Sequence, residues 1–170
     1  MEKSSYIQGS KICLGIIRHS DQENMLDILT SEEVGLTYLL PRFAQRRDAL
    51  PLFDRLKTFS EDPSRFVYGI CRQDRLIGWI NEVEIQGSEI EVGYVIHPEY
   101  KNQGFATDAL SLAITELFRL GFTAVKAAAF EENIPSMRVM EKNGMIRTGE
   151  TETLEYRGLI RRCICYKRTQ

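Results

Sequence analysis

The chain contains 170 residues, of which 43% are hydrophobic and 27% charged, and its formal net charge is −2. This length and composition predict one globular domain over residues 1–170, and the small net charge gives no electrostatic argument for a nucleic acid or an anionic membrane as partner. No stretch reaches the roughly 18 apolar residues of a transmembrane helix, and the N-terminus has no apolar signal region, so we expect a cytoplasmic protein. We further expect either a monomer or a homodimer.

The first part of the chain predicts one strand followed by two helices. Apolar residues over residues 11–18 predict the strand. Residues 20–23 read as a capping box that begins the first helix. The pattern is mixed up to residue 47, and residues 48–59 then predict a second helix with Pro51 in its first turn.

The remainder predicts a mixed sheet. The expected elements are strands at 65–72, 75–85 and 89–97, a helix at 104–120, a strand at 123–130, a helix between Asn133 and Gly144, and strands at 145–156 and 159–167. Short connections make the first strands of this series antiparallel, and the helix before residue 123 makes the next strand parallel to its predecessor. The order predicts an α+β fold, with a mostly antiparallel sheet and helices on its faces.

The segment at residues 100–107 lies between an alternating strand and an amphipathic helix. A turn with free backbone N–H groups that opens into a helix N-terminus is suited to an anionic phosphate group. Gly104 and Ala106 have almost no side chain, so the backbone can approach a ligand closely. The segment matches neither the P-loop pattern nor the dinucleotide-binding pattern.

This segment resembles a known loop. The residues Lys101, Asn102, Gln103, Gly104, Phe105 and Ala106 are similar to the acetyl-CoA pyrophosphate loop of the GNAT superfamily of N-acetyltransferases, [Q/R]-x-x-G-x-[G/A], with Lys101 where Gln or Arg is usual. Residues 132–145 also resemble the E-x-N-x-x-S-x-x-V-x-E-K-x-G-F block of the RimJ/RimL-like branch. Both blocks occur in the expected order, and the resemblance covers the whole chain.

The resemblance implies a single GNAT-like domain whose parallel strands splay around acetyl-CoA. It implies transfer of an acetyl group from acetyl-CoA to a primary amine, by direct attack in a ternary complex and without a metal. The acceptor would be a small-molecule amine or a peptide N-terminus. The core that binds acetyl-CoA would be formed by about residues 65–145, and the acceptor side by about residues 20–60 and 150–161. The alternative is a non-catalytic acyl-CoA-binding or sensing module, and a remoter alternative is a nucleotide-binding module.

The same resemblance suggests roles at the start of the last helix. Ser136 would lie beside the CoA sulfur and protonate the departing thiolate, and the helix dipole would favour that thiolate. The alternative is that Ser136 bonds only to its own backbone, as Ser near a helix start commonly does. Asn133 is a good N-cap, and in the family this Asn also binds the pantetheine or phosphate region.

The general base is expected on the strand before the loop. Glu91 is the first candidate and Glu89 the second, because both project from the same face. These carboxylates are alternatively solvated or paired with basic side chains, and some relatives have no dedicated base.

The end of this strand, Tyr94, Val95 and Ile96, would bind the pantetheine through its backbone. The N–H of Tyr94 or Val95 would polarise the thioester carbonyl. The Tyr94 side chain is expected in the core, and His97 is expected to have a structural or loop-positioning role.

Other polar residues give weaker signals. Glu150, Glu152 and Glu155 near the acceptor side would attract a cationic amine, although a charged hairpin can also simply be solvated. The 4 cysteines show no C-x-x-C spacing and have only 2 histidines as possible co-ligands. We therefore expect free thiols and no metal site.

Overall fold

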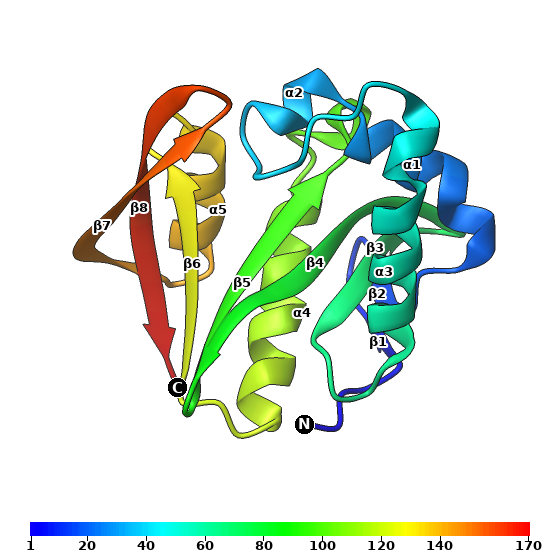
Figure 1. The fold of residues 1–170 in the computed structure, drawn as a ribbon. Coiled ribbons are helices and arrows are strands. Elements are labelled where there is room, and N and C mark those ends of the chain that lie inside the picture. The colour runs from blue at the N-terminus through cyan, green and yellow to red at the C-terminus, as the bar shows by residue number, and fades with distance from the viewer.

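A computed structural model describes residues 1–170, and its elements form one 8-stranded sheet with the strand order β1-β2-β3-β4-β5-β6-β8-β7 (Figure 1). The elements in chain order are β1 (Tyr6–Gln8), β2 (Cys13–Gly15), η1 (His19–Asp21), α1 (Gln22–Leu29), α2 (Glu32–Gly35), η2 (Arg46–Ala49), α3 (Leu50–Glu61), β3 (Val67–Arg72), β4 (Arg75–Gln86), β5 (Glu89–Ile96), η3 (Pro98–Tyr100), α4 (Phe105–Arg119), β6 (Ala124–Phe130), α5 (Ile134–Lys142), β7 (Ile146–Tyr156) and β8 (Leu159–Thr169). From β3 onward the predicted elements are confirmed to within two residues at each end, and the predicted α+β class is confirmed.

The N-terminal region departs from the prediction. The strand expected over residues 11–18 is only the short β2, and β1, which pairs with it, was not predicted. Two hydrogen bonds to side chains far away in the sequence set the limits of β2. The Ile17 N–H donates to the Oγ of Ser60 at 2.8 Å, and the Ile12 N–H donates to Asp108 at 3.3 Å, so neither remains for a strand partner.

The prediction of a capping box at residues 20–23 was also wrong. The Asp21 carboxylate accepts a hydrogen bond from the Arg18 N–H at 2.8 Å and so begins the short η1. The helix α1 then continues directly from η1 without a side-chain cap of its own. The short α2, capped by Ser31, lies in the segment whose sequence pattern was mixed.

The β5–β6 pair is the only parallel pairing in the sheet, and it is short. Its register joins Glu89 to Ala124, Ile90 to Val125 and Glu91 to Lys126, and no pairing continues beyond that point. Figure 1 shows the two strands meeting at one end and separating toward the end where both finish. Because α4 follows β5 and α5 follows β6, both of these helices begin at the open end.

Helices cover both faces of the sheet, and the sheet divides the hydrophobic core into two clusters, one on each face. On one face, β-strand residues such as Ile90 and Val92 pack against α4, for example against Leu110 and Leu117. On the other face, Trp79 and Val95 pack with residues of α1 and α3. The alternation along β5 therefore sends even-numbered side chains toward α4 and odd-numbered side chains toward the opposite face.

Tyr156 fastens the loop that follows α2 to the end of β7. Its hydroxyl lies 2.9 Å from the Gly35 carbonyl oxygen, 3.0 Å from that of Tyr38 and 3.1 Å from that of Leu40. It also accepts a hydrogen bond from the Leu40 N–H at 3.1 Å. These contacts hold the α2 loop beside the open end of the β5–β6 pair.

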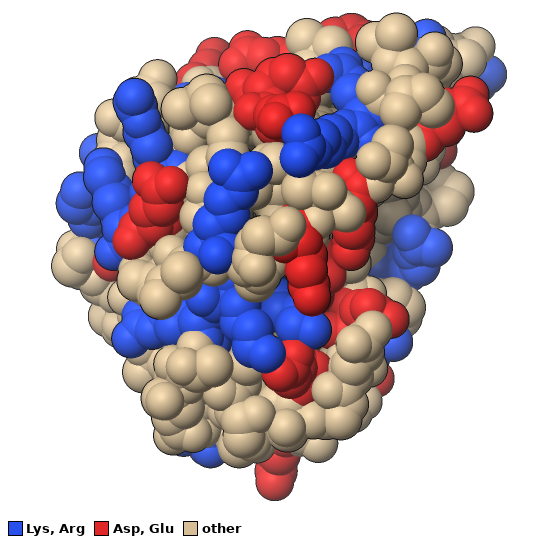
Figure 2. All heavy atoms as spheres, turned by 90° about the vertical axis from the view of Figure 1, so that its left-hand side faces the viewer, with Lys and Arg blue, Asp and Glu red and all other residues tan.

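Basic and acidic side chains are intermixed on the face shown in Figure 2, in keeping with the net charge of −2. No helix combines the length and apolarity needed to span a membrane.

Candidate active site

The loop before α4 presents a row of free backbone donors. The N–H groups of residues 102–107 have no acceptor within the protein, and the next one, that of Asp108, donates to the Gly104 carbonyl oxygen. Asn102 and Gly104 adopt positive φ angles of 61° and 83°. Asn tolerates this left-handed conformation better than most residues, and Gly adopts it without strain. The resulting turn opens into the positive end of the α4 dipole, as an anion site requires.

Lys101 itself points away from this row of donors. Its Nζ forms an ion pair of 2.7 Å with Glu33 of α2. The side chain therefore ties the loop to the acceptor side of the molecule, and the loop offers an anion its backbone rather than this cation.

The part of β5 beyond Glu91 has one free edge. Its backbone pairs with β4 on one side, where Tyr94 lies opposite Ile80 and Ile96 opposite Gly78, but with no strand on the other. The His97 N–H donates to Ile77 of β4 at 2.8 Å. By strand alternation, the Val95 backbone then also faces β4, whereas the N–H of Tyr94 faces the gap. Between the two predicted donors, the geometry favours Tyr94.

Ser136 and Tyr94 meet between α5 and β5. The Tyr94 hydroxyl lies 2.9 Å from the Ser136 Oγ and 3.1 Å from the Ser136 carbonyl oxygen. Burial raises the pKa of Tyr94, so the phenol stays protonated. The Ser136 hydroxyl thus has a side-chain partner and not the backbone bond of the alternative interpretation.

Asn133 caps α5, as predicted from the sequence. Its Oδ1 accepts a hydrogen bond from the Ser136 N–H at 3.2 Å, and its Nδ2 donates to the Thr37 carbonyl oxygen at 3.4 Å. The cap therefore joins the start of α5 to the loop that Tyr156 fastens.

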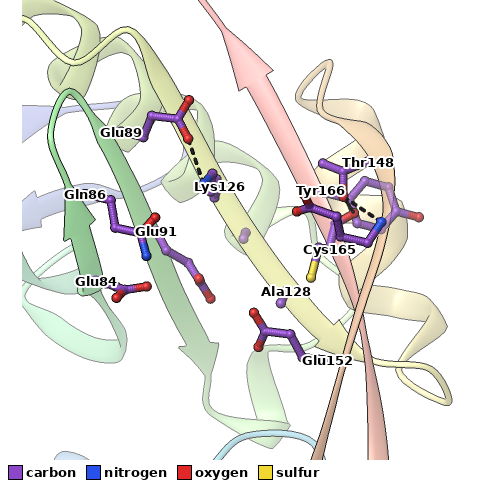
Figure 3. A pocket seen from close by; sticks show the side chains of 12 residues that line it. Glu84, Gln86, Glu89, Glu91, Lys126, Ala128, Thr148, Glu152, Cys165 and Tyr166 are labelled. Carbon is purple, nitrogen blue, oxygen red and sulfur yellow. Dashed lines mark hydrogen bonds and ion pairs between the residues drawn. The ribbon is translucent and has the colours of Figure 1, made fainter.

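A cavity of about 250 Å³ lies where β5 and β6 separate, on the face opposite α4. We call it the acidic pocket, and its charged lining residues are Glu84, Glu89, Glu91, Lys126, Glu150 and Glu152. Figure 3 shows the carboxylates of Glu84, Glu91 and Glu152 pointing into the same space from β4, β5 and β7. Glu150 and Glu152 were expected here, Glu155 does not line the cavity, and Glu84 was not foreseen.

The two predicted base candidates differ in their surroundings. Glu89 pairs with Lys126 at 2.7 Å and also with Lys167, and these partners lower its pKa. Glu91 has no ion pair with a basic residue. Burial raises the pKa of Glu91, and the charges of Glu152 and Glu84 raise it further. A carboxyl group with a raised pKa is better suited to take a proton near neutral pH.

Tyr38 closes the site beside Gly93. A Cβ at Gly93 would lie 2.9 Å from the Tyr38 hydroxyl, which donates to Asn81 at 2.8 Å. Burial raises the pKa of Tyr38 to about 12, so it is not a base at neutral pH. His97 accepts a hydrogen bond from the Glu99 N–H and caps η3, which agrees with a loop-positioning role.

Comparisons with known proteins identify the family and the fold of the chain. Residues 11–146 match the family described as "Acetyltransferase (GNAT) domain". The uncharacterized N-acetyltransferase YnaD of Bacillus subtilis is 30% identical over 122 residues, which is 71% of each chain.

Two solved structures share the fold. One is a GNAT-family acetyltransferase from Bacillus anthracis, with a TM-score of 0.83, 21% identity and coverage of 96% of this chain and 98% of that one. The other is RimL, a ribosomal L7/L12 alpha-N-protein acetyltransferase in complex with coenzyme A, with a TM-score of 0.81, 16% identity and coverage of 94% of each chain. The chain belongs to the GNAT family and is an acetyl-CoA-dependent N-acetyltransferase.

Proposed function

We propose that the protein transfers an acetyl group from acetyl-CoA to a primary amine that enters the acidic pocket as a cation. The amine attacks directly in a ternary complex, and it belongs to a small molecule or to a peptide N-terminus. The observation that carries this proposal is the convergence of Glu84, Glu91 and Glu152 at the separation of β5 and β6. Carboxylates without basic partners attract an ammonium group to the reaction centre.

The residues of the open end fit acetyl-CoA as cosubstrate. The free N–H groups of residues 102–107 would hold the pyrophosphate, and Gly104 has a φ of 83°, a conformation that glycine adopts without strain. The free edge of β5 would hold the pantetheine as an added strand, and the Tyr94 N–H would bind the carbonyl oxygen. Acetyl-CoA supplies the acetyl group as a thioester.

Glu91 acts as the general base in this proposal. An ammonium group must lose a proton before its nitrogen can attack, and Glu91 is the half-buried carboxylate whose pKa is raised by burial, Glu152 and Glu84. A base of this kind contributes roughly 10²–10⁴-fold to a rate. Glu84 and Glu152 have a supporting role, because they attract the cation and tune Glu91.

In this proposal Ser136 assists the departure of the CoA thiolate. Either oxygen of the Tyr94–Ser136 hydroxyl pair can be the donor, and when the Tyr94 hydroxyl donates to the Ser136 Oγ, the Ser136 proton would be directed toward the sulfur. The N-terminus of α5 adds the positive end of a helix dipole at the same point. The charge that develops on sulfur is thereby stabilised by both the hydroxyl and the helix.

A thiol-release assay tests the proposal. The protein is incubated with acetyl-CoA and a panel of acceptors that includes a diamine, a polyamine, an aminoglycoside, a neutral-chain monoamine and peptides with basic or acidic residues near a free N-terminus. We expect release of CoA with cationic acceptors, and slower release with acidic peptides. Binding of acetyl-CoA without amine-dependent release would overturn the proposal in favour of an acyl-CoA sensor, and a preference for acidic acceptors would overturn the role of the pocket.

A further inference from the structure

Lys11 reaches the phosphate loop from a distant part of the sequence. It lies in the turn between β1 and β2, and its Nζ donates to the Gln103 carbonyl oxygen at 3.3 Å. The same Nζ is 2.8 Å from the position that a Cβ would take at Gly104. The ammonium group therefore stands against the centre of the loop, beside the free N–H groups.

The turn that carries Lys11 is held on α4 by Asp108. The Asp108 carboxylate accepts hydrogen bonds from the Lys11 N–H at 2.9 Å, the Ile12 N–H at 3.3 Å and the Ser10 hydroxyl at 3.2 Å. Gly9 permits the close approach, since a Cβ there would lie 2.7 Å from Leu112. The backbone of Lys11 is thus fixed relative to the first turn of α4.

The Lys11 side chain keeps its charge available. None of the ion pairs in the structure includes Lys11. Lys101, the cation within the loop sequence, is occupied by Glu33. An ammonium group has three N–H donors, and the Gln103 carbonyl uses only one of them. Lys11 is therefore a side-chain cation in direct contact with the loop and free to meet an anion there.

We propose that Lys11 binds a phosphate group of acetyl-CoA and replaces Lys101 as the cation of the phosphate loop. This inference rests on the proposed binding of the cosubstrate at residues 102–107. The shared chemistry is an ammonium–phosphate hydrogen bond, and it serves either the pyrophosphate or the 3′-phosphate of CoA. Asp108 is a positioning residue, because it sets the place of Lys11 without touching the phosphate.

The test measures dissociation constants of CoA and 3′-dephospho-CoA by calorimetry for the wild-type protein, Lys11→Met, Lys11→Arg and Arg55→Met. Arg55 is an exposed arginine of α3 without an ion pair, so its variant controls for the loss of one positive charge. We expect Lys11→Met to bind CoA about tenfold more weakly, since a hydrogen bond to a charged group is involved. Lys11→Arg should keep most of the affinity, and the loss in Lys11→Met should shrink at high salt.

Comparison of CoA with 3′-dephospho-CoA shows which phosphate Lys11 contacts. An equal loss for both supports contact with the pyrophosphate, and a loss confined to CoA supports contact with the 3′-phosphate. Unchanged CoA affinity in Lys11→Met, or an equal loss in Arg55→Met, overturns the inference. A parallel titration of Gly104→Glu separates the two proposals. If Gly104→Glu abolishes binding while Lys11→Met does not weaken it, only the role of Lys11 fails, whereas undiminished binding by Gly104→Glu removes the loop site itself.

Discussion

The hydroxyl group of Tyr94 lies 2.9 Å from the Oγ of Ser136, and this contact joins β5 to the first turn of α5 where the sheet opens. Tyr94 belongs to the predicted core, and its ring does pack against that core, but its hydroxyl is directed at the site. The contact gives Ser136 a fixed orientation. The phenol has a single proton, which can go to the Ser136 Oγ or to the Ser136 carbonyl oxygen, and the Ser136 proton is free for a third group when the phenol donates to Oγ.

Ser136→Ala should lower kcat roughly 10²–10⁴-fold if the hydroxyl assists the leaving thiolate. The dissociation constant of acetyl-CoA should change little, because the loop and the β5 edge supply the binding contacts. Tyr94→Phe should give a smaller loss of kcat, since it removes only the partner of Ser136. Steady-state kinetics together with acetyl-CoA titration separate these effects, and unchanged kcat in Ser136→Ala would leave the residue a purely structural role.

Glu91→Gln should depress turnover most strongly at neutral pH, where a protonated amine most needs a base. Activity should partly recover as pH rises and the free amine becomes abundant. The Gln side chain keeps the shape of Glu, so packing is preserved. The pH–rate profile of kcat is the measurement, and a profile identical to that of the wild type would exclude Glu91 as the base.

Glu152→Gln should shift the acidic limb of the pH–rate profile to lower pH. The charge of Glu152 raises the pKa of Glu91, so its removal lowers that pKa. The KM of a cationic acceptor should rise at the same time, because one attracting charge is lost. Glu155→Gln is the matched control, since it lies on the same strand outside the pocket. Equal behaviour of the two variants would contradict the role of the pocket.

Glu116→Gln should destabilise the protein at neutral pH by about 2 kcal/mol. Hydrogen bonds from Arg119 and from the Ser4 N–H lower the pKa of Glu116 from 4.5 to about 2. Because this pKa is depressed in the folded state, the stabilisation is present above pH 4.5 and is lost as pH falls toward 2. Urea unfolding of the two proteins should therefore converge across that window, and a difference that is independent of pH would refute the assignment.

The sequence predicted the parts of the site that depend on local pattern. The loop at residues 101–106, the cap at Asn133 and the hairpins from residue 65 onward follow from alternation, turn chemistry and capping preferences, and the structure has them at those places. The parallel pairing of β5 with β6 followed from the helix between them.

The contacts that were missed join segments far apart in the chain. Asp108 holds the β1–β2 turn on α4 and so places Lys11 against the loop, and the Tyr156 hydroxyl at the end of β7 contacts the loop that follows α2. Glu84 enters the acidic pocket beside a register shift between Glu82 and Glu84. A bulge of this kind reorients side chains and has no clear signature in the sequence. Serine and aspartate acceptors also ended β2 early, through side-chain bonds that periodicity does not report.

The most direct test of the account is the titration of acetyl-CoA into Gly104→Glu and Gly121→Glu. Both glycines have positive φ, 83° and 93°, and they lie at opposite ends of α4, so the backbone strain of substitution is matched. Gly104→Glu brings a carboxylate to the row of free N–H groups, and we predict that it abolishes measurable binding while the protein stays folded. Gly121→Glu has open space around it and should bind as the wild type does. Wild-type affinity in a folded Gly104→Glu protein would contradict the central claim that this loop holds the cosubstrate.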